Sequence, residues 1–444
     1  MNVSRRCVGT VTALCVGTSA LGMTALAPSA QAEVSGGVTI PAFYNPPATL
    51  PTANGTIIRS ESVTLGVGLN IPGIVGPLPA TATRIMYKST DFAGKPVAVT
   101  GTYLEPSTRW IGGGPRPLVT FAEGTQGQGD QCAPSISLTR ALTVTSSTLN
   151  VNYEIPNIYG LLNKGVAVVV SDLVGLGTTD RVHSYVNRLD SGHAVLDAAR
   201  AATHVSGASV TPQSRVATYG YSQGGEASAA AAELAPTYAP DLNLVAGYAG
   251  APPADLTKVL PGIDGTALTG AIGYAINGFT ADYPALKAVI DANVNATGRA
   301  ALAKVATQCT VDTALSFGFA KTSSWTNSGQ SISAIVAANP AAQAVIDAQQ
   351  IGKLTPTVPM RIASGTQDDI VNHAQVRQLA LDWCRKGAKV QYVPVPQLLP
   401  SGGTALNHIG PALADALPAQ SWIVSALSGQ QVPTTGCGWI PWMA

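Results

Sequence analysis

The stretch Ser214–Ala235, SRVATYGYSQGGEASAAAAELA, changes character at Gly220-Tyr-Ser222-Gln-Gly224. The residues just before it favour a β-strand, and the alanine-rich residues after it favour a helix. A chain that passes from strand to helix at one residue needs a very sharp turn, and the flanking glycines leave room for neighbouring backbone. We therefore predict that Ser222 projects its hydroxyl above a sheet as a nucleophile, with a helix N-terminus behind it. The alternative is a glycine-rich turn with a capping serine.

A serine nucleophile needs a base, and the base needs a carboxylate that orients it. After a turn of this kind the chain order is serine, acid, histidine. Three of the five histidines precede Ser222 and come in the wrong order: His183, His193 and His204. His373 follows the best candidate acid too closely and is expected on the next helix. His408, in a glycine-containing loop ahead of a C-terminal helix, is the predicted base, unless it merely caps that helix.

Two aspartates are candidates for the acid. Asp368 and Asp369 both follow the predicted strand Val358–Ser364 and the turn at Gly365. We favour Asp368 because it comes first after the turn. Asp369 would then start a helix, as aspartate often does.

An oxyanion is typically stabilised by two backbone N–H groups, one of them from the residue after the nucleophile. Gln223 occupies that position. The glycine-rich segment after the predicted strand Pro117–Phe121 is expected to supply the second, and we select Thr125, with Gly124 and Gln126 as alternatives. The other interpretation is a plain glycine loop.

Short apolar runs alternate with helical stretches over much of the chain. Gly165–Val170 is apolar without alternation, which is typical of a strand covered on both faces. A hairpin is predicted over Thr83–Lys88 and Pro96–Leu104, after an irregular segment from Glu33 to Ala80. Antiparallel strands followed by strand–helix units predict an α/β fold with a mostly parallel sheet. The further predicted strands are Gly165–Ser171, Arg215–Tyr219, Asn243–Tyr248 and Lys389–Val395, and the helices are Ser191–Val205, Gln223–Leu234, Asn372–Lys386 and Gly410–Leu427.

Residues 251–353 break this rhythm, because they contain helical spacing and no convincing strand. Structureless loops of this length are rare in compact domains. We therefore expect a helical cap inserted over 251–353, with the core formed by 33–250 and 354–444.

The 444 residues carry a net charge of +1, and only 11% of them are charged. A basic patch is absent, which argues against nucleic acid as a partner. A basic start, an apolar stretch and Ala30-Gln-Ala32 predict a signal peptide over residues 1–32 and export of the protein. Four cysteines then remain, Cys132, Cys309, Cys384 and Cys437. Their even number predicts two disulfides with three possible pairings, and their spacing does not fit a metal site.

Several motifs together resemble the secretory lipases of the Candida antarctica lipase A type. Besides the Ser222 turn and the late His408, the matching segments are Gly129-Asp-Gln-Cys-Ala-Pro-Ser135, Asp172-Leu-Val-Gly-Leu-Gly177, Gln367-Asp-Asp-Ile-Val371 and Gly436-Cys-Gly438. The resemblance covers most of the chain after residue 32.

This resemblance implies an α/β-hydrolase fold with the cap inserted before the acid, and a triad of Ser222, Asp368 and His408. It also implies the disulfides Cys132–Cys309 and Cys384–Cys437, an ester or lipid substrate, contact with a lipid–water interface, and no metal or organic cofactor. One departure stands out: related chains often have His-Gly-Thr where this chain has Glu123-Gly124-Thr125.

Other functions share parts of this pattern. A cutinase or polyester hydrolase has a similar serine motif but is much shorter, a general esterase differs only in substrate, and a secreted serine peptidase shares the triad logic. Glu123 in the oxyanion loop also keeps open a non-catalytic protein that retains the fold. Neither the acyl-chain length nor the oligomeric state follows from the sequence.

Overall fold

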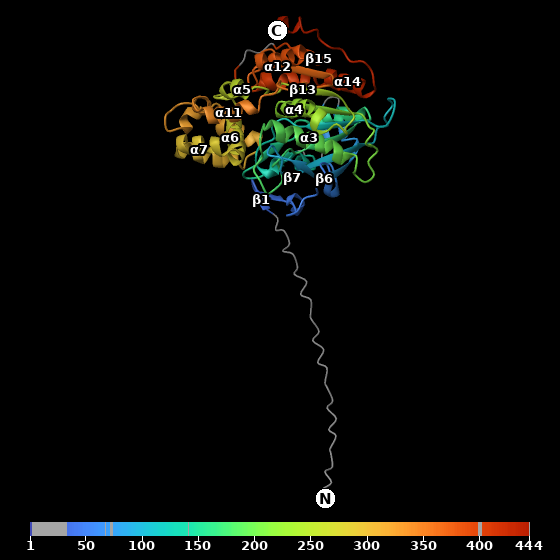
Figure 1. Cartoon of the computed structure of the whole chain (residues 1–444), viewed down its shortest axis with the longest axis horizontal. Coiled ribbons are helices and arrows are strands. Elements are labelled where there is room, and N and C mark those ends of the chain that lie inside the picture. The colour runs from blue at the N-terminus through green and yellow to red at the C-terminus, as the bar shows by residue number, and fades with distance from the viewer. Residues whose placement is uncertain (2–32, 67, 72–73, 141, 398–401, 444) are drawn as a thin grey trace. The chain divides into compact units, whose positions relative to one another are not determined.

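A nine-stranded sheet forms the centre of the molecule (Figure 1). The computed structural model describes Met1 and residues 33–443, with gaps at 67, 72–73, 141 and 398–401. Apart from Met1, the predicted signal peptide lies outside the described residues. In spatial order the strands are β15 (Val390–Val395), β14 (Met360–Gly365), β13 (Leu244–Gly250), β12 (Val216–Tyr221), β8 (Leu118–Ala122), β11 (Ala167–Ser171), β7 (Pro96–Pro106), β6 (Ala80–Thr90) and β3 (Ile57–Val63).

The strands from β15 to β11 pair in parallel, whereas β11–β7, β7–β6 and β6–β3 are antiparallel. The sequence of β11 is apolar without alternation because both of its faces are buried. Val168 and Val170 belong to one core cluster, and Ala167 and Val169 belong to the cluster on the other face. The prediction of a mostly parallel α/β sheet is confirmed.

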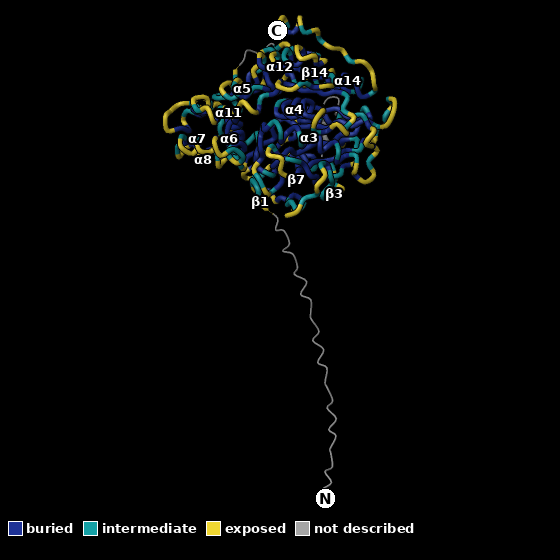
Figure 2. The backbone as a smooth tube through the Cα atoms, viewed as in Figure 1, coloured by how far each residue is buried: buried dark blue, intermediate teal, exposed yellow. Residues whose placement is uncertain are grey.

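Helices cover both faces of the sheet. α3 (Arg188–Ala202) and α4 (Gln223–Tyr238) share a core cluster on one face, and α2 (Ile155–Asn163) and α14 (Ala416–Leu427) share the cluster on the other. α12 (His373–Arg385) packs against β14 and β15. Figure 2 shows that α3, α4 and the strands near them are buried, while exposed residues concentrate on loops and on the outer helices.

All of residues 251–353 are described, and the regular elements that they form are helices. They are α5 (Leu256–Ile263), α6 (Ala271–Asp282), α7 (Pro284–Asn293), α8 (Ala296–Val305), α9 (Thr310–Phe317), α10 (Ile332–Ala337), α11 (Pro340–Ala348) and the 3-10 helix η3 (Thr322–Trp325). α6, α7 and α11 gather beside the sheet in Figure 1. Nowhere in the described part of the chain is a helix both long and apolar enough to cross a membrane.

Apart from α13 (Leu406–Ala414), the remaining elements are short and lie mostly before residue 152. They are β1 (Glu33–Ser35), β2 (Val38–Ile40), β4 (Gly68–Ile71), β5 (Ile74–Pro77), β9 (Leu142–Val144), β10 (Leu149–Val151), α1 (Pro134–Ser137), η1 (Ala42–Tyr44), η2 (Asp130–Cys132) and η4 (Ile440–Trp442). The prediction of an irregular segment from Glu33 to Ala80 was therefore wrong, because this segment supplies the edge strand β3 of the main sheet.

Two disulfides connect Cys132 with Cys309 and Cys384 with Cys437. This is the pairing that the family resemblance implies. The first joins the segment after β8 to the start of α9, and the second joins α12 to the C-terminal tail. A disulfide that closes a long loop typically contributes about 2–4 kcal/mol.

Candidate active site

Ser222 occupies the turn between β12 and α4, with a backbone φ of 56° and ψ of −121°. A positive φ is strained for a residue with a side chain and recurs at functional sites. A Cβ added to Gly220 would lie 2.1 Å from the Gly224 carbonyl oxygen, and one added to Gly224 would lie 1.9 Å from the Ala122 oxygen. Only glycine fits at these two positions, so the turn accounts for the motif.

A chain of hydrogen bonds runs from Ser222 to a buried carboxylate. His408 Nε2 lies 2.9 Å from Ser222 Oγ, and His408 Nδ1 lies 2.8 Å from Asp368 Oδ2. The Ser222 side chain makes no capping bond to α4. Because a carboxylate only accepts, Nδ1 carries the hydrogen and Nε2 is free to accept the serine proton. The structure thus brings together the three residues that the sequence selected.

The two candidate aspartates have different partners. Asp368 Oδ1 accepts the N–H groups of Ile370 and Val371 at 3.0 and 2.8 Å, which leaves Oδ2 facing His408. Asp369 Oδ2 accepts the N–H of Ala405 at 3.1 Å. Asp369 does not start a helix as expected, because α12 begins at His373. Its hydrogen bond to Ala405 instead holds the residues just before His408 in place.

His408 lies within a helix, not in the loop that we expected. α13 (Leu406–Ala414) begins before it, and its N-cap residue Ala405 has a left-handed conformation with a φ of 66°. Tyr221 donates its hydroxyl to the His408 carbonyl oxygen at 2.7 Å. The strand that leads to the nucleophile therefore also anchors the backbone of the histidine.

The two predicted oxyanion donors line one pocket together with Ser222. Neither the Gln223 N–H nor the Thr125 N–H has an acceptor among the described residues. The Gly124 N–H, one alternative, already donates to Glu154 Oε1 at 3.2 Å. The geometry therefore favours Thr125 over Gly124 as the second donor.

The loop that carries Thr125 is hydrogen-bonded to the start of α9, within the helical residues 251–353. Thr310 donates its backbone N–H to the Gln126 oxygen at 2.9 Å and its hydroxyl to the Thr125 oxygen at 2.7 Å. Gly127 pairs with Cys309 in an isolated β-bridge next to the disulfide. These contacts hold the loop in place before any substrate arrives, which is the condition for electrostatic stabilisation.

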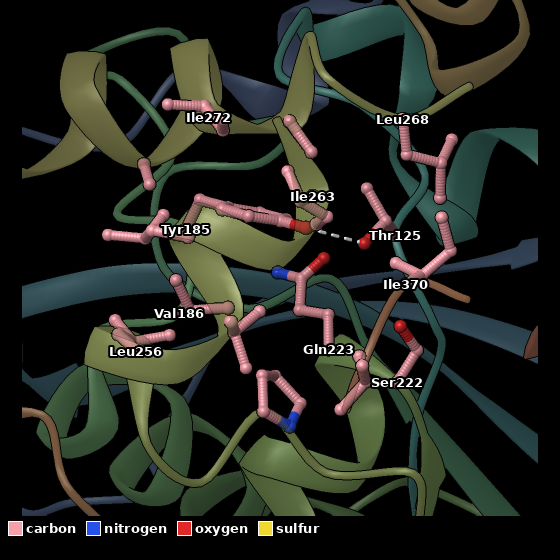
Figure 3. Close-up of a pocket in the computed structure, with 16 residues that line it drawn as sticks. Thr125, Tyr185, Val186, Ser222, Gln223, Leu256, Ile263, Leu268, Ile272 and Ile370 are labelled. Atoms are coloured by element: carbon pink, nitrogen blue, oxygen red, sulfur yellow. Dashed lines mark hydrogen bonds between the residues drawn. The ribbon is translucent and has the colours of Figure 1, made fainter. Parts of the chain in front are cut away.

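Apolar side chains line the rest of the pocket above Ser222 (Figure 3). They come from α5, from α6, from the connection between these helices and from the segment after Asp369, and they include Leu256, Val259, Ile263, Leu268, Ile272, Ile370 and Val371. The cavity volume is about 30 Å³. A pocket of this composition suits an apolar group next to a polar reaction centre.

The Glu123 carboxyl group is buried beside the oxyanion loop. Its side chain is buried, and Oε1 accepts the Asn152 amide at 2.8 Å. Burial, reinforced by the nearby carboxyl groups of Glu154 and Asp172, raises the pKa of Glu123 well above its usual range. This shift favours the uncharged form of the carboxyl group at the position where the sequence departs from the family pattern.

Sequence reasoning missed the side chains that contact the oxyanion donors, namely His183 and Tyr185. His183 was considered only as a base and set aside on chain order. These contacts join segments 40 and 60 residues apart and leave no local sequence pattern, so only the structure reveals them. Within the described residues, no group of three or more His, Cys, Asp or Glu side chains is arranged to hold a metal ion.

The sheet order and the strand–serine–helix turn define the α/β-hydrolase class. Comparison with known proteins narrows this class, because the profile of the secretory lipase family matches residues 141–435. The chain belongs to the secretory lipase family. It is a carboxylic ester hydrolase by class, and the family's secretory character agrees with the predicted export.

Individual relatives differ in the activity that their names state. Secreted triacylglycerol lipase LIP4 of Malassezia globosa is 26% identical over 401 residues, which is 89% of this chain and 82% of that protein. “Probable inactive lipase MT1628” of Mycobacterium tuberculosis is 29% identical over 351 residues, 79% of this chain and 75% of that protein. Candida antarctica lipase A in its closed state superposes with a TM-score of 0.74 at 23% identity, over 90% and 88% of the two chains.

Proposed function

We infer that the protein is an active exported lipase, which cleaves carboxylic esters with long acyl chains through an acyl-enzyme on Ser222. The observation that carries this proposal is the continuous hydrogen-bond chain from Asp368 through His408 to Ser222, which ends in an apolar pocket. A protein that had lost catalysis would be under no physical requirement to keep a strained serine, a buried carboxylate and the correct histidine tautomer together.

In the proposed reaction, His408 Nε2 takes the Ser222 proton as Oγ attacks the ester carbonyl carbon. The negative charge that develops on the carbonyl oxygen is stabilised by the N–H groups of Gln223 and Thr125. Asp368 stabilises the resulting imidazolium, which then protonates the departing alcohol. Water attacks the acyl-enzyme by the same route, with His408 again acting as base, and releases the acid.

The substrate is proposed to be a long-chain ester, with triacylglycerol as the model compound. The apolar lining from α5 and α6 supports this, as does the name of the Malassezia globosa relative. A cavity of about 30 Å³ holds only one or two water molecules, so an acyl chain requires α5 or α6 to move. The insertion over 251–353 is accordingly proposed to act as the cap of the site.

Hydrolysis of a p-nitrophenyl ester series from acetate to palmitate tests the proposal. We expect turnover at every length, with kcat/KM rising toward the longer acyl chains, because each methylene buried against the pocket contributes about 0.8 kcal/mol, roughly a fourfold gain in kcat/KM. The measurement is initial rate against acyl length, with peptide p-nitroanilides as the comparison substrate and circular dichroism as the check on folding.

The outcomes separate the rival functions. Cleavage of the shortest esters alone would indicate a general esterase, and cleavage of the anilides would indicate a peptidase. Release of soluble products from a polyester film in preference to long-chain esters would indicate a cutinase-like enzyme. A folded protein that turns over no ester would contradict the proposal and favour a non-catalytic role.

The proposed enzyme works on insoluble substrate, and the outer face of α13 and α14 supports a role at a lipid–water interface. The large side chains exposed there are apolar: Leu406, Ile409, Leu413 and Leu417. Between residues 406 and 421 the only acidic or basic residue besides His408 is Asp415, which is buried in an ion pair with Arg361. The solvent face of a helix is ordinarily polar, and α13 also carries His408.

The double variant Leu413→Gln/Leu417→Gln should hydrolyse emulsified triolein roughly thirtyfold more slowly, because each leucine withdrawn from lipid costs on the order of 1 kcal/mol. Hydrolysis of dissolved p-nitrophenyl butyrate should stay unchanged. Ile111→Gln is the matched control, since Ile111 is exposed and precedes the N-terminal end of β8, whereas Ser222 follows the C-terminal end of the parallel neighbour β12. Equal losses on the emulsion and on the dissolved ester would contradict an interfacial role for this face.

A further inference from the structure

One short segment contacts both residues of the proposed oxyanion hole. His183 and Tyr185 lie between β11 and α3, far in sequence from the loop after β8 and from the nucleophile turn. His183 Nε2 lies 2.7 Å from Gln223 Nε2, and the Tyr185 hydroxyl lies 2.7 Å from Thr125 Oγ1. We propose that His183 and Tyr185 are positioning residues, which hold the backbone N–H groups of Gln223 and Thr125 in place beside Ser222. This inference rests on the proposed function.

The tautomer of His183 is fixed by its surroundings. Its Nδ1 lies 2.8 Å from the Val174 carbonyl oxygen, which can only accept, so Nδ1 carries the hydrogen. Nε2 is then an acceptor, and the Gln223 amide nitrogen donates to it. Burial lowers the pKa of His183 to about 4, and the ring therefore stays neutral and keeps this acceptor at neutral pH.

The bond to His183 restrains the first residue of α4. Gln223 has no helical acceptor for its N–H at that position, so its backbone direction depends on the turn and on what its side chain contacts. Both side chains are almost fully buried, with 2% of His183 and 3% of Gln223 exposed. Breaking the bond would leave a buried amide donor unsatisfied and would free the Gln223 side chain to move.

Tyr185 acts on the other donor. Its hydroxyl bonds the Thr125 side chain, while the Thr125 carbonyl oxygen accepts the hydroxyls of Thr310 and Tyr153 at 2.7 and 3.0 Å. The side chain and the carbonyl of Thr125 are thus both fixed, and its N–H has no acceptor among the described residues. In Figure 3 the Tyr185 hydroxyl and Thr125 Oγ1 meet above Gln223 and Ser222.

Backbone strain marks the same segment. Val186, directly after Tyr185, has a φ of 53°, which is a costly conformation for a β-branched residue. Leu173, directly before the carbonyl that binds His183, has a φ of 67°. Such outliers persist where surrounding contacts fix them and cluster at functional sites. A segment that only filled space between β11 and α3 would not need two of them.

The test compares four variants on p-nitrophenyl palmitate and with a long-chain trifluoromethyl ketone, which forms a tetrahedral adduct with a serine. Removing one oxyanion donor typically costs about 100- to 1,000-fold in kcat. Misplacing one should cost less, so we expect His183→Leu and Tyr185→Phe each to lower kcat about tenfold to a hundredfold. KM should change less than threefold, while the inhibitor constant should rise in parallel with the fall in kcat.

Two further variants separate positioning from simple packing. His183→Gln, whose side-chain oxygen can accept from Gln223, should recover most of the activity. Tyr44→Phe is the matched control, because it removes a buried tyrosine–serine hydroxyl bond of 2.8 Å to Ser135 that does not touch the pocket. It should lower the melting temperature about as much as Tyr185→Phe and leave kcat and the inhibitor constant unchanged.

The results distinguish this inference from the proposed function. If the wild-type protein hydrolyses no ester, the proposed function fails and the inference fails with it. If the wild type is active and Tyr185→Phe leaves both kcat and the inhibitor constant unchanged, only the inference is overturned. Should His183→Leu not fold, Tyr185→Phe and His183→Gln still decide the question. Parallel losses of kcat in Tyr44→Phe would also overturn it.

Discussion

Replacing Ser222 with alanine is expected to abolish ester hydrolysis, with a fall in kcat of at least about 10⁴-fold. The variant lacks the oxygen that attacks the carbonyl, and no other described serine lies within hydrogen-bonding distance of His408. Stability should change little, because Ser222 makes no capping bond and alanine tolerates the positive φ of 56° no worse than serine. The measurements are hydrolysis of p-nitrophenyl palmitate and the melting temperature.

Ser228→Ala is the matched control for this change. Ser228 lies on the same helix, is fully buried and donates its hydroxyl to Thr218 Oγ1 at 2.8 Å. It should lose some stability through the missing hydrogen bond but keep its activity. Residual turnover in Ser222→Ala within a hundredfold of the wild type would contradict the nucleophile assignment, and loss of activity in Ser228→Ala would show that the assay reports folding.

The parts of the site that the sequence could predict are those fixed by short-range chemistry. The Ser222 turn requires glycine at two positions, and this requirement can be recognised in the five residues from Gly220 to Gly224. The runs that became β8, β12 and β14 could be recognised because buried parallel strands are apolar on both faces. Chain order then selected His408 as the base, and the position directly after the Gly365 turn favoured Asp368 as the acid.

The parts that the sequence could not predict depend on contacts between distant segments. β3 is half exposed and carries charged residues, so its pattern does not mark it as an edge strand. α13 starts at Leu406 behind an alanine and contains Pro411, so neither the usual capping residue nor an uninterrupted helical run signals that His408 is helical. The bonds of His183 and Tyr185 to the oxyanion donors exist only because β11, β8 and β12 are neighbours in the sheet.

The second large effect is expected from Asp368→Asn, and the structure explains why it should be severe. Asp368 Oδ1 accepts two backbone N–H groups, so the amide oxygen of asparagine will take that position. The amide NH₂ then faces His408 Nδ1, which must become the acceptor and move its hydrogen to Nε2. A histidine with hydrogen on Nε2 cannot take the serine proton, so kcat should fall by about 10⁴-fold.

Asp369→Asn is the matched control for the acid, and it also decides between the two neighbouring carboxylates. Asp369 accepts the Ala405 N–H through Oδ2, while Oδ1 is buried without a partner. An asparagine oxygen can keep the Oδ2 contact and place NH₂ at the unpartnered position, so activity should stay within about fivefold of the wild type, in keeping with the loss of no more than one hydrogen bond. The reverse ranking of the two variants would mean that Asp369 orients His408 when substrate is bound. The two variants should differ because the two carboxylates accept different hydrogen bonds. Asp368 Oδ1 already accepts two backbone N–H groups, so an asparagine at 368 can only direct its NH₂ group at His408, whereas Asp369 makes no hydrogen bond to His408.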